Sequence, residues 1–218
     1  MSARARTFNT TVGMARVHHR EAETAPGSPA RGTLVLGHGA GGGVESADLQ
    51  ALAGLAGHGW HTVLIEQPWR VAGRRIAVAP PKLDEATAQI LTALGSQPCL
   101  PRPWVLGGRS AGARVACRLS EYAQACLLIA FPLVPRRRDG SSGPRRSPEL
   151  MIPLLRGIPT LVVQGDRDRF GGPGDIAAVI SQSGAQQAQV VSYRGDHAVP
   201  RDLVALMQDV SGFLDALA

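Results

Sequence analysis

Long apolar runs, aromatic residues and lysines are scarce in this chain of 218 residues. The longest apolar run, residues 125–131, is too short to cross a bilayer, and the polar N-terminus does not resemble a secretory signal. Aromatic residues make up 4% of the chain, too few to stack nucleic-acid bases. We therefore expect no membrane insertion, no nucleic-acid partner and a cytoplasmic location.

The cysteine content is equally low. Cys99, Cys117 and Cys126 are an odd number with irregular spacing, which favours packed or free thiols over a disulfide framework or a metal site. The net charge of +6 comes almost entirely from arginine, because Lys82 is the only lysine. Most arginines are scattered along the chain, as on a solvated surface. We predict neither a metal nor a cofactor.

Short apolar segments alternate with segments of helical periodicity. This pattern predicts an α/β fold with a doubly wound, mostly parallel sheet. Strands are expected at 33–36, 61–66, 103–106, 125–131, 159–164 and 189–193, and helices at 45–56, 83–94, 111–122 and 202–217.

The chain is expected to form one domain over residues 1–218. Residues 1–32 would supply N-terminal edge strands and a turn. Residues 135–148, PRRRDGSSGPRRSP, are rich in arginine, proline, serine and glycine, and we predict a mobile loop there.

The fold is organised around the segment 104–116, WVLGGRSAGARVA. It predicts a strand, a tight turn at Gly107 and Gly108, and then a helix, with Ser110 at the centre of a G-x-S-x-G motif. A serine in so sharp a turn adopts a strained conformation that exposes its hydroxyl. The glycines two residues before and after it allow the strand and the helix to approach closely.

In an open parallel sheet, ligands bind beyond the carboxyl ends of the strands. Four such ends are followed by GHGAGGG (37–43), by Ser110, by GDRDRFG (165–171) and by RGDH (194–197). They supply a nucleophile, an acid and a base in the chain order Ser…Asp…His, which is the order of the α/β-hydrolase fold. A serine hydroxyl requires an imidazole to take its proton, and a carboxylate must hold that imidazole in the correct tautomer.

We predict Ser110 as the nucleophile, His197 as the base and Asp168 as the acid. Asp168 stands four residues past its strand, where a loop can reach His197. Asp166 lies closer to the strand end and is the alternative acid, whereas Asp196 is expected at the surface.

Further residues of the site follow from the same loops. The backbone N–H groups of Ala40 and Ala111 are expected to form an oxyanion hole. His38 is a candidate substrate contact, although bracing the glycine loop is its preferred role. Arg109, together with residues 136–138, is a candidate for binding a carboxylate or phosphate on the substrate.

The motifs TLVLGHGAGGG, WVLGGRSAGARVA, TLVVQGDRDRFG and YRGDHAVP resemble the α/β-hydrolase superfamily. Within it, HGAGG, GGRSAGAR and VVQGDRDRFG are similar to a small hydrolase-like group. That group includes bacterial dienelactone-hydrolase-like proteins, a testis-expressed protein and a regulatory subunit of the NSL histone acetyltransferase complex. The resemblance implies the same roles for Ser110, Asp168, His197 and Ala40. The short chain implies an α/β-hydrolase fold without a large cap domain.

These features predict a serine hydrolase that cleaves an ester, a thioester or a similar acyl bond of a small molecule through an acyl-enzyme. We expect a monomer or a homodimer. One alternative is a non-catalytic scaffold, since some eukaryotic members of the group look like scaffolds. Another is a dinucleotide-binding oxidoreductase, because Gly37 to Gly42 fit G-x-G-x-x-G and Glu66 ends the next strand.

Overall fold

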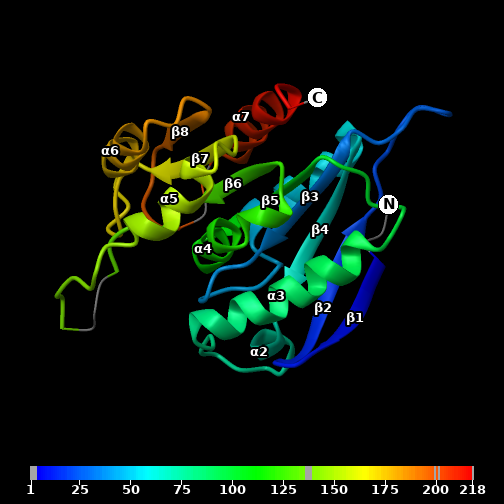
Figure 1. Ribbon diagram of the computed structural model, residues 1–218, viewed down its shortest axis with the longest axis horizontal. Helices are drawn as coiled ribbons and strands as arrows, with labels where there is room; N and C mark the ends of the chain where they lie inside the picture. Colours follow the sequence, from blue (N-terminus) through cyan, green and yellow to red (C-terminus); the bar gives the residue numbers. More distant parts are fainter. Residues whose placement is uncertain (1–3, 136–138, 199, 201, 218) are drawn as a thin grey trace.

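A single eight-stranded sheet runs through the molecule in the order β1-β2-β4-β3-β5-β6-β7-β8 (Figure 1). The computed structural model describes residues 4–135, 139–198, 200 and 202–217. Strands β3 to β8 are parallel, and the β1–β2 hairpin joins β4 in antiparallel orientation at one edge. The strands are β1 (Arg4–Thr10), β2 (Gly13–Arg20), β3 (Gly32–Gly37), β4 (Trp60–Glu66), β5 (Trp104–Arg109), β6 (Ala125–Ile129), β7 (Thr160–Gly165) and β8 (Ala188–Tyr193).

Helices cover both faces of the sheet, so the core consists of two apolar layers. One face packs against α2 (Pro68–Val71), α3 (Pro80–Gly95), α4 (Ala111–Arg118), α5 (Ser147–Leu155) and α6 (Pro173–Ser183). The other face packs against α1 (Ala47–Ala53) and α7 (Leu203–Asp215). Two 3-10 helices, Gly54–His58 and Ser120–Tyr122, extend α1 and α4. Strand β6 is buried along its whole length, which accounts for its continuous apolar sequence.

The predicted α/β fold with a doubly wound, mostly parallel sheet is confirmed. One local prediction is wrong. Gly107 and Gly108 belong to β5, and the chain turns at Ser110 instead. Residues 149–155, for which the sequence predicts no element, form most of α5, whose first two residues end the expected loop at 135–148.

Prolines occur in both α5 and α6, two helices that the sequence pattern did not predict. Pro148 and Pro173 occupy the first turns of these helices, where the missing N–H has no intrahelical acceptor to lose. Pro153 lies inside α5. Arg136, Arg137 and Arg138, near the start of the expected arginine-rich loop, lie outside the described residues. Among the helices that the structure describes, none is long and apolar enough to cross a membrane.

Candidate active site

Ser110 forms a sharp elbow between β5 and α4. Its φ of 52° and ψ of −103° are unusual for a residue with a side chain, and its N–H donates to the carbonyl oxygen of Ile129 at 2.9 Å. Such strained conformations cost roughly 1–3 kcal/mol and persist only where the surroundings enforce them. Here the tight contact between Gly112 of α4 and Gly37 of β3 enforces the turn.

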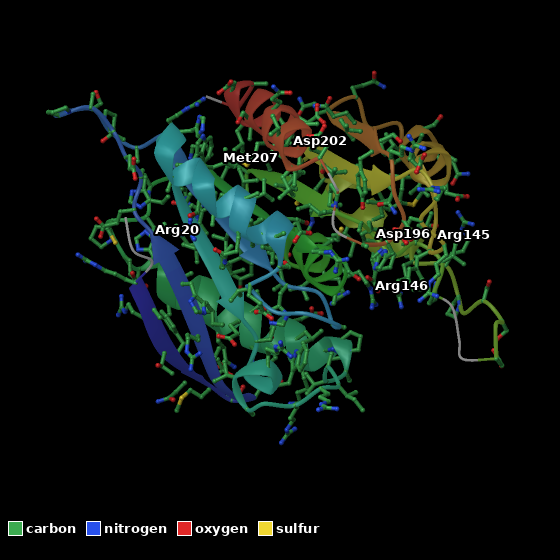
Figure 2. The ribbon with its side chains drawn as sticks, turned by 180° about the vertical axis from the view of Figure 1, so that it is seen from behind. Arg20, Arg145, Arg146, Asp196, Asp202 and Met207 are labelled. Atoms are coloured by element: carbon green, nitrogen blue, oxygen red, sulfur yellow. The ribbon has the colours of Figure 1, made fainter. Side chains whose placement is uncertain are left out.

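The structure brings Ser110, His197 and Asp168 together in one chain of contacts. The Nε2 atom of His197 lies 3.0 Å from the Ser110 hydroxyl, and its Nδ1 atom lies 2.7 Å from the Oδ2 atom of Asp168. These residues follow β5, β7 and β8, whose carboxyl ends meet at the same edge of the sheet. Figure 2 shows Asp196, the neighbour of His197, on the side of the molecule opposite Arg20 of β2.

The Asp168 carboxylate is held from several directions and has no exposed side-chain surface. Its Oδ1 atom accepts the N–H of Phe170 at 2.8 Å, and its Oδ2 atom accepts the side-chain amide of Gln164 at 2.9 Å in addition to contacting His197. A buried carboxylate with this many donors is fixed in orientation. The ring of Phe170 packs edge-on against the imidazole of His197, with centroids 4.5 Å apart.

The other two acidic residues shape the His197 loop. Asp166 accepts the backbone N–H of Gly195 at 2.8 Å, and Asp196 accepts that of Ala198 at 2.8 Å. Neither carboxylate has a described contact with the imidazole, so the geometry favours Asp168 over Asp166 as its partner.

Ala40 and Ala111 both line one small cavity of about 10 Å³. Ala111 is the first residue of α4, so its N–H has no acceptor within the helix. Ala40 belongs to the glycine loop that follows β3. Because both residues line the same space next to the elbow, Ala40 and Ala111 stay the predicted donors of an oxyanion hole.

His38 is buried at the root of the glycine loop. Its Nε2 atom accepts the N–H of Gln67 at 3.1 Å, which leaves the proton on Nδ1, 2.9 Å from the carbonyl oxygen of Gly39. Burial lowers the pKa of His38, so the imidazole is neutral at neutral pH. Both ring nitrogens are engaged, so the side chain braces the loop and keeps no nitrogen for a substrate.

The glycine loop lacks the geometry of a dinucleotide site. In that motif a helix begins within the glycine run and its N-terminus faces the pyrophosphate, whereas α1 begins only at Ala47. Glu66, the candidate ribose-binding acid, is engaged by Arg16 and His18 at 3.2 and 3.1 Å.

Residues 30–204 match the family model described as an alpha/beta hydrolase domain. The chain belongs to the alpha/beta hydrolase family. The solved structures similar to this hydrolase-family chain share its fold at low sequence identity. An alpha-beta serine hydrolase homologue from Coxiella burnetii is 18% identical with a TM-score of 0.77, the alignment covering 100% of this chain and 99% of that one. No curated protein matches the sequence.

Two further solved structures share the fold of this hydrolase-family chain. XC6422 from Xanthomonas campestris, a serine hydrolase without a lid, is 20% identical with a TM-score of 0.74, over 100% of this chain and 95% of that one. Est1E from Butyrivibrio proteoclasticus is 14% identical with a TM-score of 0.73, over 96% and 97% of the two chains. The fold agrees with the predicted α/β-hydrolase architecture without a large cap domain.

Sequence reasoning missed the residues that support the site of this hydrolase-family protein. Gln164 is a buried polar residue at the end of an otherwise apolar strand, a signal that was available in TLVVQ. Tyr193 ends β8 and hydrogen-bonds the carbonyl oxygens of Asp196 and Ala198 at 3.1 and 3.0 Å. Burial raises the pKa of Tyr193 to about 12, so the phenol remains a proton donor at neutral pH.

Proposed function

We propose that this protein is a serine hydrolase that cleaves an ester, a thioester or a similar acyl bond through an acyl-enzyme. The observation that carries the proposal is the continuous chain from Ser110 through His197 to the buried carboxylate of Asp168, with contacts of 3.0 and 2.7 Å. Each residue then has one role: nucleophile, general base and acid, and orienting carboxylate.

In the first half-reaction, His197 takes the hydroxyl proton at Nε2 while the oxygen of Ser110 bonds to the acyl carbon. The carbonyl π electrons move onto oxygen, and this oxyanion accepts hydrogen bonds from the N–H groups of Ala40 and Ala111. The tetrahedral intermediate collapses as His197 returns its proton to the leaving alcohol or thiol. Asp168, at Nδ1, stabilises the transient imidazolium.

In the second half-reaction, a water molecule attacks the acyl-enzyme, and His197 again accepts and then returns one proton. The Ser110 hydroxyl and the free acid are formed, so all atoms and charges balance without a cofactor. This proposal retains the small-molecule acyl substrate expected from the sequence. The monomeric or homodimeric state, the absence of nucleic-acid partners and the cytoplasmic location stay predictions.

A fluorophosphonate probe tests the proposed function. We expect the wild-type protein to be labelled once, with the adduct on Ser110 in a peptide map, because only an activated hydroxyl reacts rapidly. Ser110→Ala should not be labelled, and heat-denatured wild type serves as a second negative control. A folded wild-type protein that is not labelled and hydrolyses no activated ester would instead support the scaffold alternative.

The cavity beside Ala40 and Ala111 supports a small acyl group. Its volume of about 10 Å³ is about the space needed to hold one water molecule. Its apolar walls include Trp69, Leu83 and Val115. A larger cavity of about 780 Å³ lies between β8 and α7, but its lining includes neither Ala40 nor Ala111, the two proposed oxyanion donors that line the smaller cavity. We therefore assign the acyl group to the smaller cavity.

We expect kcat/KM to be at least tenfold lower for p-nitrophenyl hexanoate than for p-nitrophenyl acetate, because the small cavity has no space for the additional methylene groups. Leu83→Ala should shift this preference toward longer acyl chains by about tenfold, because the change opens the cavity wall. Leu91→Ala is the matched control, since it removes the same atoms from the same helix without lining the cavity. An identical chain-length profile in both variants and wild type would refute the assignment.

A further inference from the structure

A buried charge pair adjoins the elbow. Asp48, in the first turn of α1, has no exposed surface, and its Oδ2 atom lies 3.2 Å from the Nε atom of Arg109. The two atoms are within ion-pair distance but are not aligned as a hydrogen bond, so their attraction is mainly electrostatic. A carboxylate removed from water requires such a partner, because an unpaired buried charge is strongly destabilising.

Arg109 occupies the position before Ser110 and reaches toward the His197 loop. Its Nη2 atom donates to the backbone carbonyl oxygen of His197 at 2.5 Å. Its Nη1 atom lies so close to the glycine loop that a Cβ atom at Gly39 would be 3.1 Å away. One guanidinium therefore touches α1, the loop bearing the oxyanion donor Ala40 and the loop bearing the proposed base.

Arg109 holds the loop that carries His197 through the backbone carbonyl of His197. The carbonyl groups on either side, those of Asp196 and Ala198, bond to the Tyr193 hydroxyl. The carbonyl oxygen of His197, which lies between them in the chain, accepts a hydrogen bond from Arg109. Because the imidazole reaches Ser110 only in one backbone placement, a loop shift of about 1 Å is expected to cost about a hundredfold in rate.

We propose that Asp48 and Arg109 form a positioning pair that holds His197 within reach of Ser110, and that Arg109 does not bind the substrate. The proposal rests on the proposed function and revises the role that the sequence suggested for Arg109. The guanidinium side chain is only 16% exposed, and its described contacts are with Asp48, the His197 carbonyl and the glycine loop. A substrate anion would have to compete with these contacts.

The test measures kcat and KM separately for a neutral ester, p-nitrophenyl acetate, and an anionic ester, mono-p-nitrophenyl succinate. In Arg109→Met, kcat should fall about a hundredfold for both esters with KM within threefold of wild type. Arg109→Lys should recover part of kcat, because an ammonium group restores one donor. Asp48→Asn should also lower kcat, and its effect should not add to that of Arg109→Met if the residues act as a pair.

Arg31→Met is the matched control. It removes an arginine that is ion-paired to Asp215 just before β3, at the opposite end of the strands, and it should leave kcat unchanged. A rise in KM confined to the anionic ester in Arg109→Met would make Arg109 a substrate-binding residue and overturn the proposal. So would an unchanged kcat in folded Arg109→Met and Arg109→Lys while the wild type is labelled by fluorophosphonate. Lack of labelling and hydrolysis in the wild type would overturn the proposed function itself, and this inference with it.

Discussion

Asp168→Asn is expected to lower kcat/KM for p-nitrophenyl acetate by about four orders of magnitude. The Phe170 N–H donates to Oδ1, so the asparagine oxygen takes that position and its NH2 group occupies the position of Oδ2, while the Gln164 amide keeps two backbone carbonyl acceptors. That NH2 group then faces Nδ1 of His197, 2.7 Å away in the native contact. Nδ1 must become the acceptor, and the imidazole proton moves to Nε2. An Nε2–H cannot accept the proton of Ser110, so the nucleophile is not activated.

Asp166→Asn is the matched control for this change. Asp166 uses one oxygen to accept the Gly195 N–H, and an asparagine oxygen preserves that bond. We expect its kcat/KM to stay within about threefold of wild type, since the surface loop keeps its shape. Thermal unfolding of both variants separates loss of fold from loss of chemistry. If Asp166→Asn were the inactive variant and Asp168→Asn the active one, the assignment of the acid would be reversed.

The sequence was sufficient to predict the candidate site residues that lie in short segments at strand ends. The G-x-S-x-G motif indicates an elbow between a strand and a helix, and the Ser…Asp…His order is read from the loops that follow β5, β7 and β8. The sequence favoured Asp168 over Asp166 from its distance past the strand, but it did not reveal the contacts that orient either carboxylate. In the structure, Gln164 and the Phe170 N–H select Asp168.

Contacts between segments distant in the chain were not predictable in the same way. Arg109 in isolation looks like an available cation beside the nucleophile. Its role changes only when Asp48, 61 positions earlier, and the His197 carbonyl, 88 positions later, are seen to engage it. The residues next to Arg109 in the sequence do not indicate which distant groups it contacts. An arginine can pair with a buried carboxylate or with an external anion equally well.

The contact between β3 and α4 predicts a large loss of stability in Gly112→Ala. The new Cβ atom would lie 2.5 Å from the carbonyl carbon of Gly37, well inside contact distance. The obstacle is backbone in the centre of the sheet, which cannot rotate away as a side chain can. Overpacking usually costs 1–3 kcal/mol, and we expect about 3 kcal/mol here, which corresponds to a fall in Tm of roughly 10 °C for a chain of this size.

Gly212→Ala provides the comparison, because it makes the same chemical change inside α7, where no atom lies within 4 Å of the added Cβ. A helical glycine replaced by alanine should stabilise the protein by about 0.5–1 kcal/mol. The two substitutions are thus expected to shift Tm in opposite directions. Because α4 carries Ala111 and follows Ser110 directly, Gly112→Ala should also slow fluorophosphonate labelling below its melting temperature. A Tm within 1 °C of wild type would mean that strand and helix are not in contact, and the strained elbow that the proposed chemistry requires would lose its physical cause.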